Sequence, residues 1–376
     1  MFAMSPTRFF YGVDKTMTKR KVSAIAMLIL LIAAYLLVWP VPIDPLAWEA
    51  PPNDGYSGSY APNDKLADIK SIDLKGRTGP EDAAFGPDGL LYIATHEGVI
   101  IRYDPASDMV SEFAKTGGRP LGIEFSKNGI LYVADAYRGL LKISKDGNVT
   151  VLASQTSAGT PINYADDLDI APDGTVYFSD ASTRFGAKQS GGTLAASILD
   201  LMEHQPNGRV LRYDPANGKT TIVLEGLSFA NGIAMTQNGK YYLVVETGTY
   251  SIKKIALDGN SVPETIIKNL PGFPDNINRN ADGTFWVGLV SPRSAVADAL
   301  SDQPFLRKVV MRLPAFMRPS AKRYGFVVKI NESGDVLETL QDATGTYAMT
   351  TGLIEGKDGR RYITSLTEAK LGVLEP

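Results

Sequence analysis

Side chains that carry oxygen recur at one fixed position of a repeated phrase. The phrase is Asp/Asn-Gly-x-x-Tyr/Trp, and it occurs six times, with its glycines at Gly89, Gly129, Gly174, Gly239, Gly283 and Gly359. The residues eight positions before these glycines are Glu81, Leu121, Asp166, Asn231, Asp275 and Thr351. Four of these six are carboxylates or carboxamides, and Asn276 directly follows one of them. Three carboxylates that converge repel one another unless a cation lies between them, and oxygen ligands of this number suit Ca²⁺ better than Mg²⁺ or Mn²⁺.

The phrase also predicts the elements that would bring these residues together. An Asp-Gly or Asn-Gly pair between alternating apolar residues indicates a β-hairpin with a type I′ turn, whose residues need positive φ. Each repeat is expected to contain three strands, and strand-built repeats of roughly 40–50 residues are typical of a β-propeller. Residues 71–376 are therefore predicted to form an all-β propeller with six blades. If the strand before each turn is innermost, the six strand starts form a ring around the axis. The other interpretation is that these polar residues are merely solvated residues at strand ends. It would readily explain one such residue, but it explains less well four at the same position of the repeat.

Further polar residues are expected beside this ring. Asp82 and Asp167 each follow a ring residue, and they would either hold a second cation deeper in the tunnel or cap neighbouring backbone amides. The loops after the second strands return to the face of the ring and contribute the candidate pocket residues His96, Asp135, Tyr137, Asp180, Glu246, Thr247 and Ser291. Leu121 and Thr351 complete the pocket. His96 is the histidine placed to titrate near neutral pH, so it is a candidate catalytic base, with a solvated loop residue as the alternative.

The composition excludes several classes of function. The net charge of −3 provides no basic field for nucleic acid. The chain has no cysteine, which excludes disulfides, thiol nucleophiles and thiolate zinc sites, and its two histidines exclude a histidine-rich metal site. The second of them, His204, lies in an insertion and is not expected to be catalytic. Neither a phosphate-binding glycine loop nor a G-x-S-x-G elbow is present.

Two repeats contain insertions. The third is interrupted by residues 184–205, with a short helix predicted over 194–202, and the fifth by residues 291–323. Within the second insertion, residues 305–318 alternate apolar side chains with arginine and lysine, which predicts a basic amphipathic helix or helix pair. This helix would either pack on the rim of the propeller or form a lid or a contact with a membrane surface.

The N-terminal region differs in kind from the repeats. Residues 1–21 form a basic tail, residues 22–42 contain an uncharged apolar run that ends in prolines, and residues 43–70 read as a linker. The run is long enough to span a bilayer, and the basic flank would stay in the cytoplasm, which places the propeller on the extracytoplasmic side. An uncleaved signal anchor is favoured over a cleaved signal peptide, because no clear cleavage site follows the run.

Six segments resemble the strictosidine synthase-like family, which includes the adipocyte plasma membrane-associated proteins. They are GRPLGIEF (118–125), LYVADAYRGLLKI (131–143), DDLDIAPDGTVYFSDASTRF (166–185), GRVLRYDP (208–215), LSFANGIAM (227–235) and NLPGFPDNINRN (269–280). The resemblance covers about residues 75–374, and it extends more distantly to paraoxonases and gluconolactonases. It implies a six-bladed propeller with one N-terminal anchor and, from the distant relatives, calcium-dependent hydrolysis of esters or lactones.

The resemblance also implies roles for individual residues. The ligands of a paraoxonase-type catalytic calcium would be Glu81, Asp166, Asn231, Asp275 and Asn276, with an aspartate at 166 where the family usually has asparagine. A second calcium would use Asp82 and Asp167. Two positions depart from the relatives. The catalytic histidine of paraoxonases would stand at Leu121, and the glutamate of strictosidine synthase would stand at or beside Thr351.

The expected function is a membrane-anchored, calcium-dependent hydrolase of esters or lactones that acts on a small molecule. A ring carboxylate such as Asp275, or else His96, would activate the attacking water. A non-catalytic binding propeller with a structural cation is the alternative. Condensation of an amine with an aldehyde, as in strictosidine synthase, is disfavoured because no acid stands near Thr351 and Glu355 is too near the turn.

Overall fold

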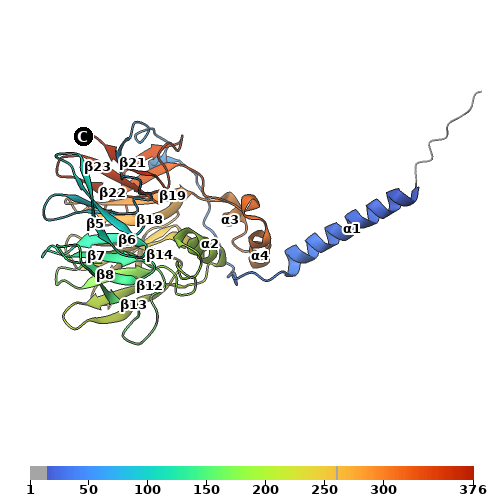
Figure 1. Cartoon of the computed structure of the whole chain (residues 1–376), viewed down its shortest axis with the longest axis horizontal. Coiled ribbons are helices and arrows are strands. Elements are labelled where there is room, and N and C mark those ends of the chain that lie inside the picture. The colour runs from blue at the N-terminus through green and yellow to red at the C-terminus, as the bar shows by residue number, and fades with distance from the viewer. Residues whose placement is uncertain (1–14, 260) are drawn as a thin grey trace, which may run out of the picture.

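Six four-stranded antiparallel sheets surround one axis, which confirms the six-bladed propeller. The computed structural model describes residues 15–259 and 261–376. The first strands of successive blades contact one another, so these strands lie innermost, as the repeat predicted. The propeller lies at one end of the molecule, and an N-terminal helix extends away from it (Figure 1).

The first three blades take their strands in chain order, from the axis outward. Blade one consists of β2 (Ala83–Phe85), β3 (Leu91–Ala94), β4 (Val99–Asp104) and β5 (Met109–Lys115). Blade two consists of β6 (Pro120–Phe125), β7 (Leu131–Asp135), β8 (Gly139–Ile143) and β9 (Val149–Ala153). Blade three consists of β10 (Ala165–Ile170), β11 (Val176–Asp180), β12 (Gly208–Asp214) and β13 (Lys219–Leu227).

The remaining three blades follow the same order, except that the last takes its outer strand from the N-terminal side of the propeller. Blade four consists of β14 (Ala230–Met235), β15 (Tyr241–Glu246), β16 (Ser251–Ala256) and β17 (Glu264–Ile267), with η2 (Thr247–Thr249) after its second strand. Blade five consists of β18 (Gly272–Arg279), β19 (Phe285–Pro292), β20 (Gly325–Ile330) and β21 (Val336–Asp342). Blade six consists of β22 (Thr350–Glu355), β23 (Arg361–Ser365), β24 (Lys370–Leu374) and β1 (Lys70–Asp73). The propeller is therefore closed by the antiparallel pairing of β1 with β24, in which Lys70 lies opposite Val373.

The expected three strands per repeat omitted the outer strand of each blade. These strands have weak hydrophobic patterns: β5, with the sequence MVSEFAK, buries only Ala114 fully. A strand at the outer edge packs against few neighbours, so its sequence carries little of the alternation by which a strand is recognised.

The six turns also differ from the expected type. In each, the glycine N–H donates to the carbonyl three residues earlier, as Gly89 does to Gly86 over 3.0 Å. The glycine has positive φ, +82° at Gly89, whereas Asp88 does not. The turn is therefore a type I turn followed by a left-handed glycine, and the prediction of type I′ was wrong. Pro87 gives the reason in blade one, because its ring fixes φ near −65°.

The hydrophobic core lies between neighbouring blades, and the repeated aromatic residue of the phrase contributes to it. Tyr92 of blade one meets Phe125 of blade two edge-on, with ring centroids 4.8 Å apart. Tyr177 and Tyr242 approach to 5.4 Å between blades three and four. The aromatic residue therefore recurs because each junction between blades needs a large apolar side chain.

Both insertions lie on the face where the innermost strands begin. The first forms α2 (Thr193–Glu203), which confirms the helix predicted over 194–202, and it connects β11 to β12. The second forms α3 (Ala295–Ala299), α4 (Pro304–Arg312) and η3 (Ala315–Met317), and it connects β19 to β20. Because β11 and β19 run antiparallel to the innermost strands, they end on the ring face. Figure 1 shows α2, α3 and α4 between the propeller and the N-terminal helix.

The N-terminal helix, α1 (Lys15–Val38), ends two residues before Pro40. Its window from Lys21 to Val38 has a mean hydropathy of 2.4 and none of it is buried, so it is long and apolar enough to cross a bilayer. Arg312 of α4 binds its C-terminal end, with Nη1 2.9 Å from the carbonyl oxygen of Leu36 and Nε 2.5 Å from that of Trp39. Of the basic tail expected over residues 1–21, residues 1–14 lie outside the described residues.

The segment expected to be a linker lies against the propeller. Ile43 is buried on the ring face, and the N–H of Leu46 donates to the carbonyl of Glu203 in α2 over 2.9 Å. The ring of Trp48 stacks on His204 at 3.9 Å between centroids. After η1 (Gly58–Tyr60), Leu66 is fully buried between blades five and six. Residues 41–66 are therefore part of the folded body rather than a free tether.

Candidate functional site

A β-bulge recurs at the start of the innermost strands and determines how the ring residues point. The register shifts between Ala165 and Leu168 in β10, and the same shift occurs in β6, β14, β18 and β22. Two residues of the inner strand, Asp166 and Asp167 in blade three, therefore oppose a single partner. Bulges redirect side chains beside functional sites. The bulge brings consecutive residues to the axis, which simple alternation along a strand would not do.

The ring predicted from the repeat is brought together in the structure. Asn276 donates from Nδ2 to Oε1 of Glu81 over 3.3 Å, and Asn231 donates from Nδ2 to Oδ1 of Asp275 over 2.6 Å. All four are buried, as is Asp166, with exposures of 6% or less. Residues from blades one, three, four and five thus meet at one end of the axis.

The ring carboxylates act on one another through their charges. Burial raises the pKa of Glu81 well above its ordinary value, and the charges of Asp275 and Asp166 raise it further. Burial, followed by the charge of Asp275, raises the pKa of Asp166 in the same way. Burial raises the pKa of Asp275 to about 7, although the hydrogen bond from Asn231 opposes the shift. Three buried acids that disfavour one another's ionisation form a strong potential site for a positive charge.

The donor atoms of the ring fit an oxygen-bound cation. Glu81 Oε2, Asn231 Oδ1 and Asn276 Oδ1 are buried and have no hydrogen-bond partner among the described residues. The NH₂ groups of both asparagines are turned to neighbouring carboxylates, which leaves the amide oxygens free. Within residues 15–259 and 261–376, no three acid or histidine side chains alone come close enough to hold a metal, so any cation would need these amide oxygens.

Asp82 and Asp167 connect neighbouring blades. Asp82 Oδ2 accepts the backbone N–H of Ile123 in blade two over 2.9 Å, and its Oδ1 accepts Nδ2 of Asn278 over 3.0 Å. Asp167 accepts the N–H groups of Leu168 and, in blade four, Ile233, each over 2.8 Å. All four oxygens thus have donors. These contacts are the amide caps of the second interpretation, and the second cation stays a prediction.

Small residues in the even-numbered blades permit these contacts. The position that follows the ring residue is occupied, from blade one to blade six, by Asp82, Gly122, Asp167, Gly232, Asn276 and Gly352. A Cβ on Gly122 would lie 2.6 Å from the Cα of Asp167, and a Cβ on Gly232 would lie 2.6 Å from the carbonyl oxygen of Asp275. The alternation of a long polar residue with glycine therefore allows inner strands to approach closely.

Three of the predicted pocket acids have structural partners. Asp135 accepts the N–H of Arg119 over 2.9 Å, and Asp180 accepts that of Tyr164 over 2.8 Å. Glu246 accepts the N–H of Ser228 over 2.8 Å. In each case the end of the second strand is bonded to the backbone just before the inner strand of its own blade. Asp180 and Glu246 also form ion pairs, with Arg209 at 2.8 Å and with Lys253 at 2.5 Å respectively.

The other predicted pocket residues divide between the ring and its margin. Thr247 accepts Nδ2 of Asn231 over 3.2 Å, and Thr351 donates to the carbonyl of Glu81 over 2.6 Å, so both touch the ring. Leu121 and Tyr137 belong to one apolar cluster above it. Ser291 accepts the N–H of Lys322 in the fifth-blade insertion. Glu355 lies apart from the ring and binds Trp286 Nε1 over 2.8 Å.

His96 lies on an exposed loop near the ring rather than in it. Its pKa is lowered by burial and by the positive charge of Arg119, and raised in part by Glu97. His204, by contrast, is buried under Trp48, and burial lowers its pKa to about 3.

The main site residue that the sequence reasoning missed is Arg119. It is 1% exposed, and its charge acts on all three ring carboxylates. It stands two positions before Leu121. The residues two positions before the ring residues, which we call one level of the repeat, are Gly79, Arg119, Tyr164, Phe229, Phe273 and Met349. Counting ten rather than eight residues back from each turn glycine would have found this single charge among mostly aromatic and apolar residues.

The insertions and the N-terminal segment cover the mouth of the axis beside this level. Leu121, Tyr164 and Phe229 pack in one cluster with Ile43 of the N-terminal segment and Met311 of α4. The rings of Tyr164 and Phe229 meet edge-on at 5.4 Å. The wall above the ring is therefore aromatic, and part of it belongs to the segment that follows α1.

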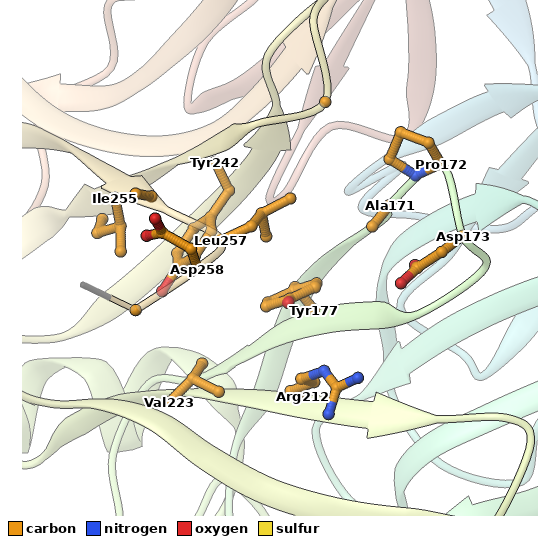
Figure 2. Close-up of a pocket in the computed structure, with 13 residues that line it drawn as sticks. Ala171, Pro172, Asp173, Tyr177, Arg212, Val223, Tyr242, Ile255, Leu257 and Asp258 are labelled. Atoms are coloured by element: carbon orange, nitrogen blue, oxygen red, sulfur yellow. The ribbon is translucent and has the colours of Figure 1, made fainter. Parts of the chain in front are cut away.

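A separate pocket lies away from the ring. It has a volume of about 560 Å³ and lies between blades three and four, beside the turn Pro172–Asp173 and the side chains of Tyr177, Arg212 and Tyr242 (Figure 2). The turns lie at the opposite end of the inner strands from the ring. This pocket contains none of the ring residues, so the candidate chemistry remains at the ring.

Comparison with known proteins agrees with this architecture. The family model described as "Strictosidine synthase" matches residues 166–260, and that described as "Strictosidine synthase-like, N-terminal" matches residues 58–103. The chain is 34% identical to the strictosidine synthase-like protein 10 of Arabidopsis thaliana, over 85% of this chain and 92% of that protein. It is 33% identical to the adipocyte plasma membrane-associated protein of Salmo salar, over 92% of this chain and 86% of that protein.

Solved structures share the fold at low identity. A gluconolactonase from Xanthomonas campestris superposes with a TM-score of 0.60 at 17% identity, covering 88% of this chain and 98% of that one. A calcium-binding regucalcin from Agrobacterium tumefaciens superposes with a TM-score of 0.57 at 16% identity, covering 81% and 93%. These likenesses establish the propeller, and the sequence relatives establish more: the chain is a member of the strictosidine synthase-like family.

Proposed function

We propose that this protein is a membrane-anchored hydrolase of ester or lactone bonds that uses a calcium ion held by the ring. The observation that carries the proposal is the set of three buried, unpartnered oxygens, on Glu81, Asn231 and Asn276, beside two further buried acids. A buried polar atom without a partner is costly, so three such oxygens beside two buried acids support the binding of a cation there. The names of the gluconolactonase and calcium-binding neighbours are consistent with this chemistry.

The ring residues divide the work of hydrolysis. A bound calcium ion would polarise the substrate carbonyl and stabilise the oxyanion. Asp275 accepts the proton of the attacking water on Oδ2, because its Oδ1 is held by Asn231. Asn231 and Asn276 orient the carboxylates of Asp275 and Glu81 through their NH₂ groups. The aromatic wall and the covering helices exclude water from the mouth.

The anchor completes the proposal. α1 spans the membrane as an uncleaved signal anchor, its N-terminus is cytoplasmic, and the propeller lies on the extracytoplasmic side. The adipocyte plasma membrane-associated relative supports a membrane location by its name. The insertion face lies next to α1, and it exposes the apolar side chains of Phe305, Phe316 and Met317, whereas Arg307 and Arg312 of α4 are buried. This face would therefore contact the lipid surface, with the mouth of the axis directed toward it.

An assay with a chelator tests the hydrolase. The full chain is used because residues 41–66 are part of the folded body, and it is purified in detergent because α1 is apolar and unburied. Aryl esters and lactones are then offered with Ca²⁺ and with chelator. Turnover should require Ca²⁺ and should disappear in Glu81→Gln and Asp275→Asn, while Asp302→Asn, an exposed change in the insertion, should leave it unaltered. Activity that ignores the chelator, or that survives loss of both ring acids, would refute the proposal.

A non-catalytic binding propeller is the second candidate. Leu121 and Thr351 favour it, because each occupies a ring position where better-known relatives carry a catalytic side chain. The Thr351 hydroxyl is fully used, since it donates to the carbonyl of Glu81 and meets the hydroxyl of Thr364 at 2.8 Å. In this case Ca²⁺ would raise the melting temperature although no ester or lactone is hydrolysed. An amine-plus-aldehyde assay tests the condensation of strictosidine synthase, for which no product is expected.

A further inference from the structure

Arg119 carries a charge that the described residues leave unsatisfied. Its side chain is 1% exposed, and its one hydrogen bond runs from Nη1 to the carbonyl of Pro120 over 3.4 Å. Nε and Nη2 have no partner among the described residues, and no carboxylate in that part of the chain lies within 4 Å of the guanidinium. An arginine stays charged in a protein, so this arrangement buries an ion that no carboxylate contacts directly, although the ring carboxylates lie close enough to act on it through their charge.

The backbone of Arg119 is nevertheless held firmly. Its N–H donates to Asp135 over 2.9 Å, and its carbonyl accepts the N–H of Ala136 over 2.8 Å. The same Asp135 oxygen accepts the N–H groups of Tyr137 and Arg138. The structure thus fixes the base of the side chain while its polar end has few partners, which is typical of a residue positioned for a ligand.

The unpartnered atoms have a definite geometry. Nε–H and Nη2–H lie on the same edge of a guanidinium and point in parallel. Two parallel N–H donors match the two oxygens of a carboxylate, or two oxygens of a phosphate, in a bidentate pair. The edge that remains free in Arg119 is therefore the one suited to an oxyanion.

We propose that the free edge of Arg119 binds the acidic group, a carboxylate or a phosphate, of a substrate or product whose apolar body lies against Tyr164 and Phe229. Arg119 carries the one charge at its level of the repeat, and these two aromatic residues occupy the same level in blades three and four. The inference rests on the proposed function, because a cation in the ring takes up the charges of Glu81, Asp166 and Asp275 and leaves Arg119 free. It restricts the substrates to esters or lactones that also carry an acid, or that release one beside Arg119.

Binding of three small probes tests this inference without relying on turnover. Phenylacetate, phenyl phosphate and the neutral phenylacetamide are titrated by calorimetry into the full chain in detergent with Ca²⁺. At least one of the two anions should bind roughly 10- to 100-fold more tightly than the amide, which is the range for hydrogen bonds to a charged group. Arg119→Gln should remove most of that preference and leave the amide affinity unchanged. Arg138→Gln, a change at a nearby arginine that binds the carbonyl of Thr116, is the matched control.

The outcomes separate the two proposals. Equal affinity for anions and amide in the unaltered protein overturns the inference, as does a preference that persists in Arg119→Gln, because the cation alone would then explain it. If Arg119→Gln does not fold, Arg119→Lys decides: it keeps the charge but loses the paired donors, so an undiminished preference contradicts the bidentate edge. Anion binding without hydrolysis of any ester supports this inference and refutes the hydrolase. Hydrolysis of an ester or lactone without a preference for anions supports the hydrolase and refutes this inference.

Discussion

The substitution Asp275→Asn should stabilise the protein in the absence of calcium, although it removes a candidate catalytic group. Asp275 is 6% exposed, and burial raises its pKa to about 7. An ordinary aspartate has a pKa near 4. Between these values the folded state holds a proton that the unfolded chain has released. A difference of about 3 pKa units corresponds to about 4 kcal/mol of stability.

The sign follows from the raised pKa. In chelator, the contribution of Asp275 lowers the stability of the unaltered protein as pH rises from about 4 to about 7. The asparagine variant has no charge to bury and can still accept the hydrogen bond from Asn231, so it should lack this decline. The two proteins should melt together near pH 4. At pH 8 the variant should melt higher, by roughly 5–15 °C if the full 4 kcal/mol appears.

Differential scanning fluorimetry of the full chain in detergent measures this difference between pH 4 and pH 8. Ca²⁺ at pH 8 should raise the melting temperature of the unaltered protein and raise that of Asp275→Asn much less, because one charged ligand is gone. Asp302→Asn, an exposed change, should behave like the unaltered protein. A variant that melts lower than the unaltered protein at pH 8 in chelator would refute the reasoning, since Asp275 would then stabilise the fold as an anion.

Three further predictions follow from other parts of the structure. Burial and the charge of Arg307 lower the pKa of His204 to about 3, so folding stability should fall as pH drops below about 6.5, and a pH series of melting temperatures should lose this acid limb in His204→Gln. Arg312→Ala removes the hydrogen bonds to the last carbonyls of α1, so limited proteolysis should cut residues 39–45 faster while the melting temperature of the propeller changes little. A Cβ on Gly288 would lie 2.1 Å from the carbonyl oxygen of Thr351, so Gly288→Ala should destabilise the junction of blades five and six by about 3 kcal/mol, measured by thermal or denaturant unfolding.

The repeated phrase predicted the fold and the ring because both depend only on the spacing of residues relative to the turn glycines. Once each turn glycine marks the end of an inner strand, the positions of Glu81, Asn231 and Asp275 are equivalent by counting, and the structure brings them to one place. The bulge was not predictable in this way, because no single residue type requires it. It explains how Asp167 reaches a neighbouring blade from a position beside Asp166.

Other features escaped prediction because they depend on long-range packing. The carboxylates of Asp135 and Asp180 point to strand-start amides, and their type and position alone did not distinguish this role from a pocket wall. Residues 43–70 read as a linker because they contain many proline and polar residues, yet Ile43 and Trp48 pack against side chains from the two insertions. Arg119 lies two residues before the ring position of its blade, so the ring positions alone did not reveal it, and its burial depends on packing by the insertions.

The pairing of β1 with β24 has a consequence for the synthesis of the chain. β1 emerges from the ribosome early, but its partner is β24, a strand that ends at Leu374. At roughly 5–20 residues per second, the intervening chain takes about 15–60 s to make. During that time the first strand has no partner, and it can pair only after synthesis has almost finished. A chain that stops before Lys370 could build five blades, yet it would have no strand with which to close them.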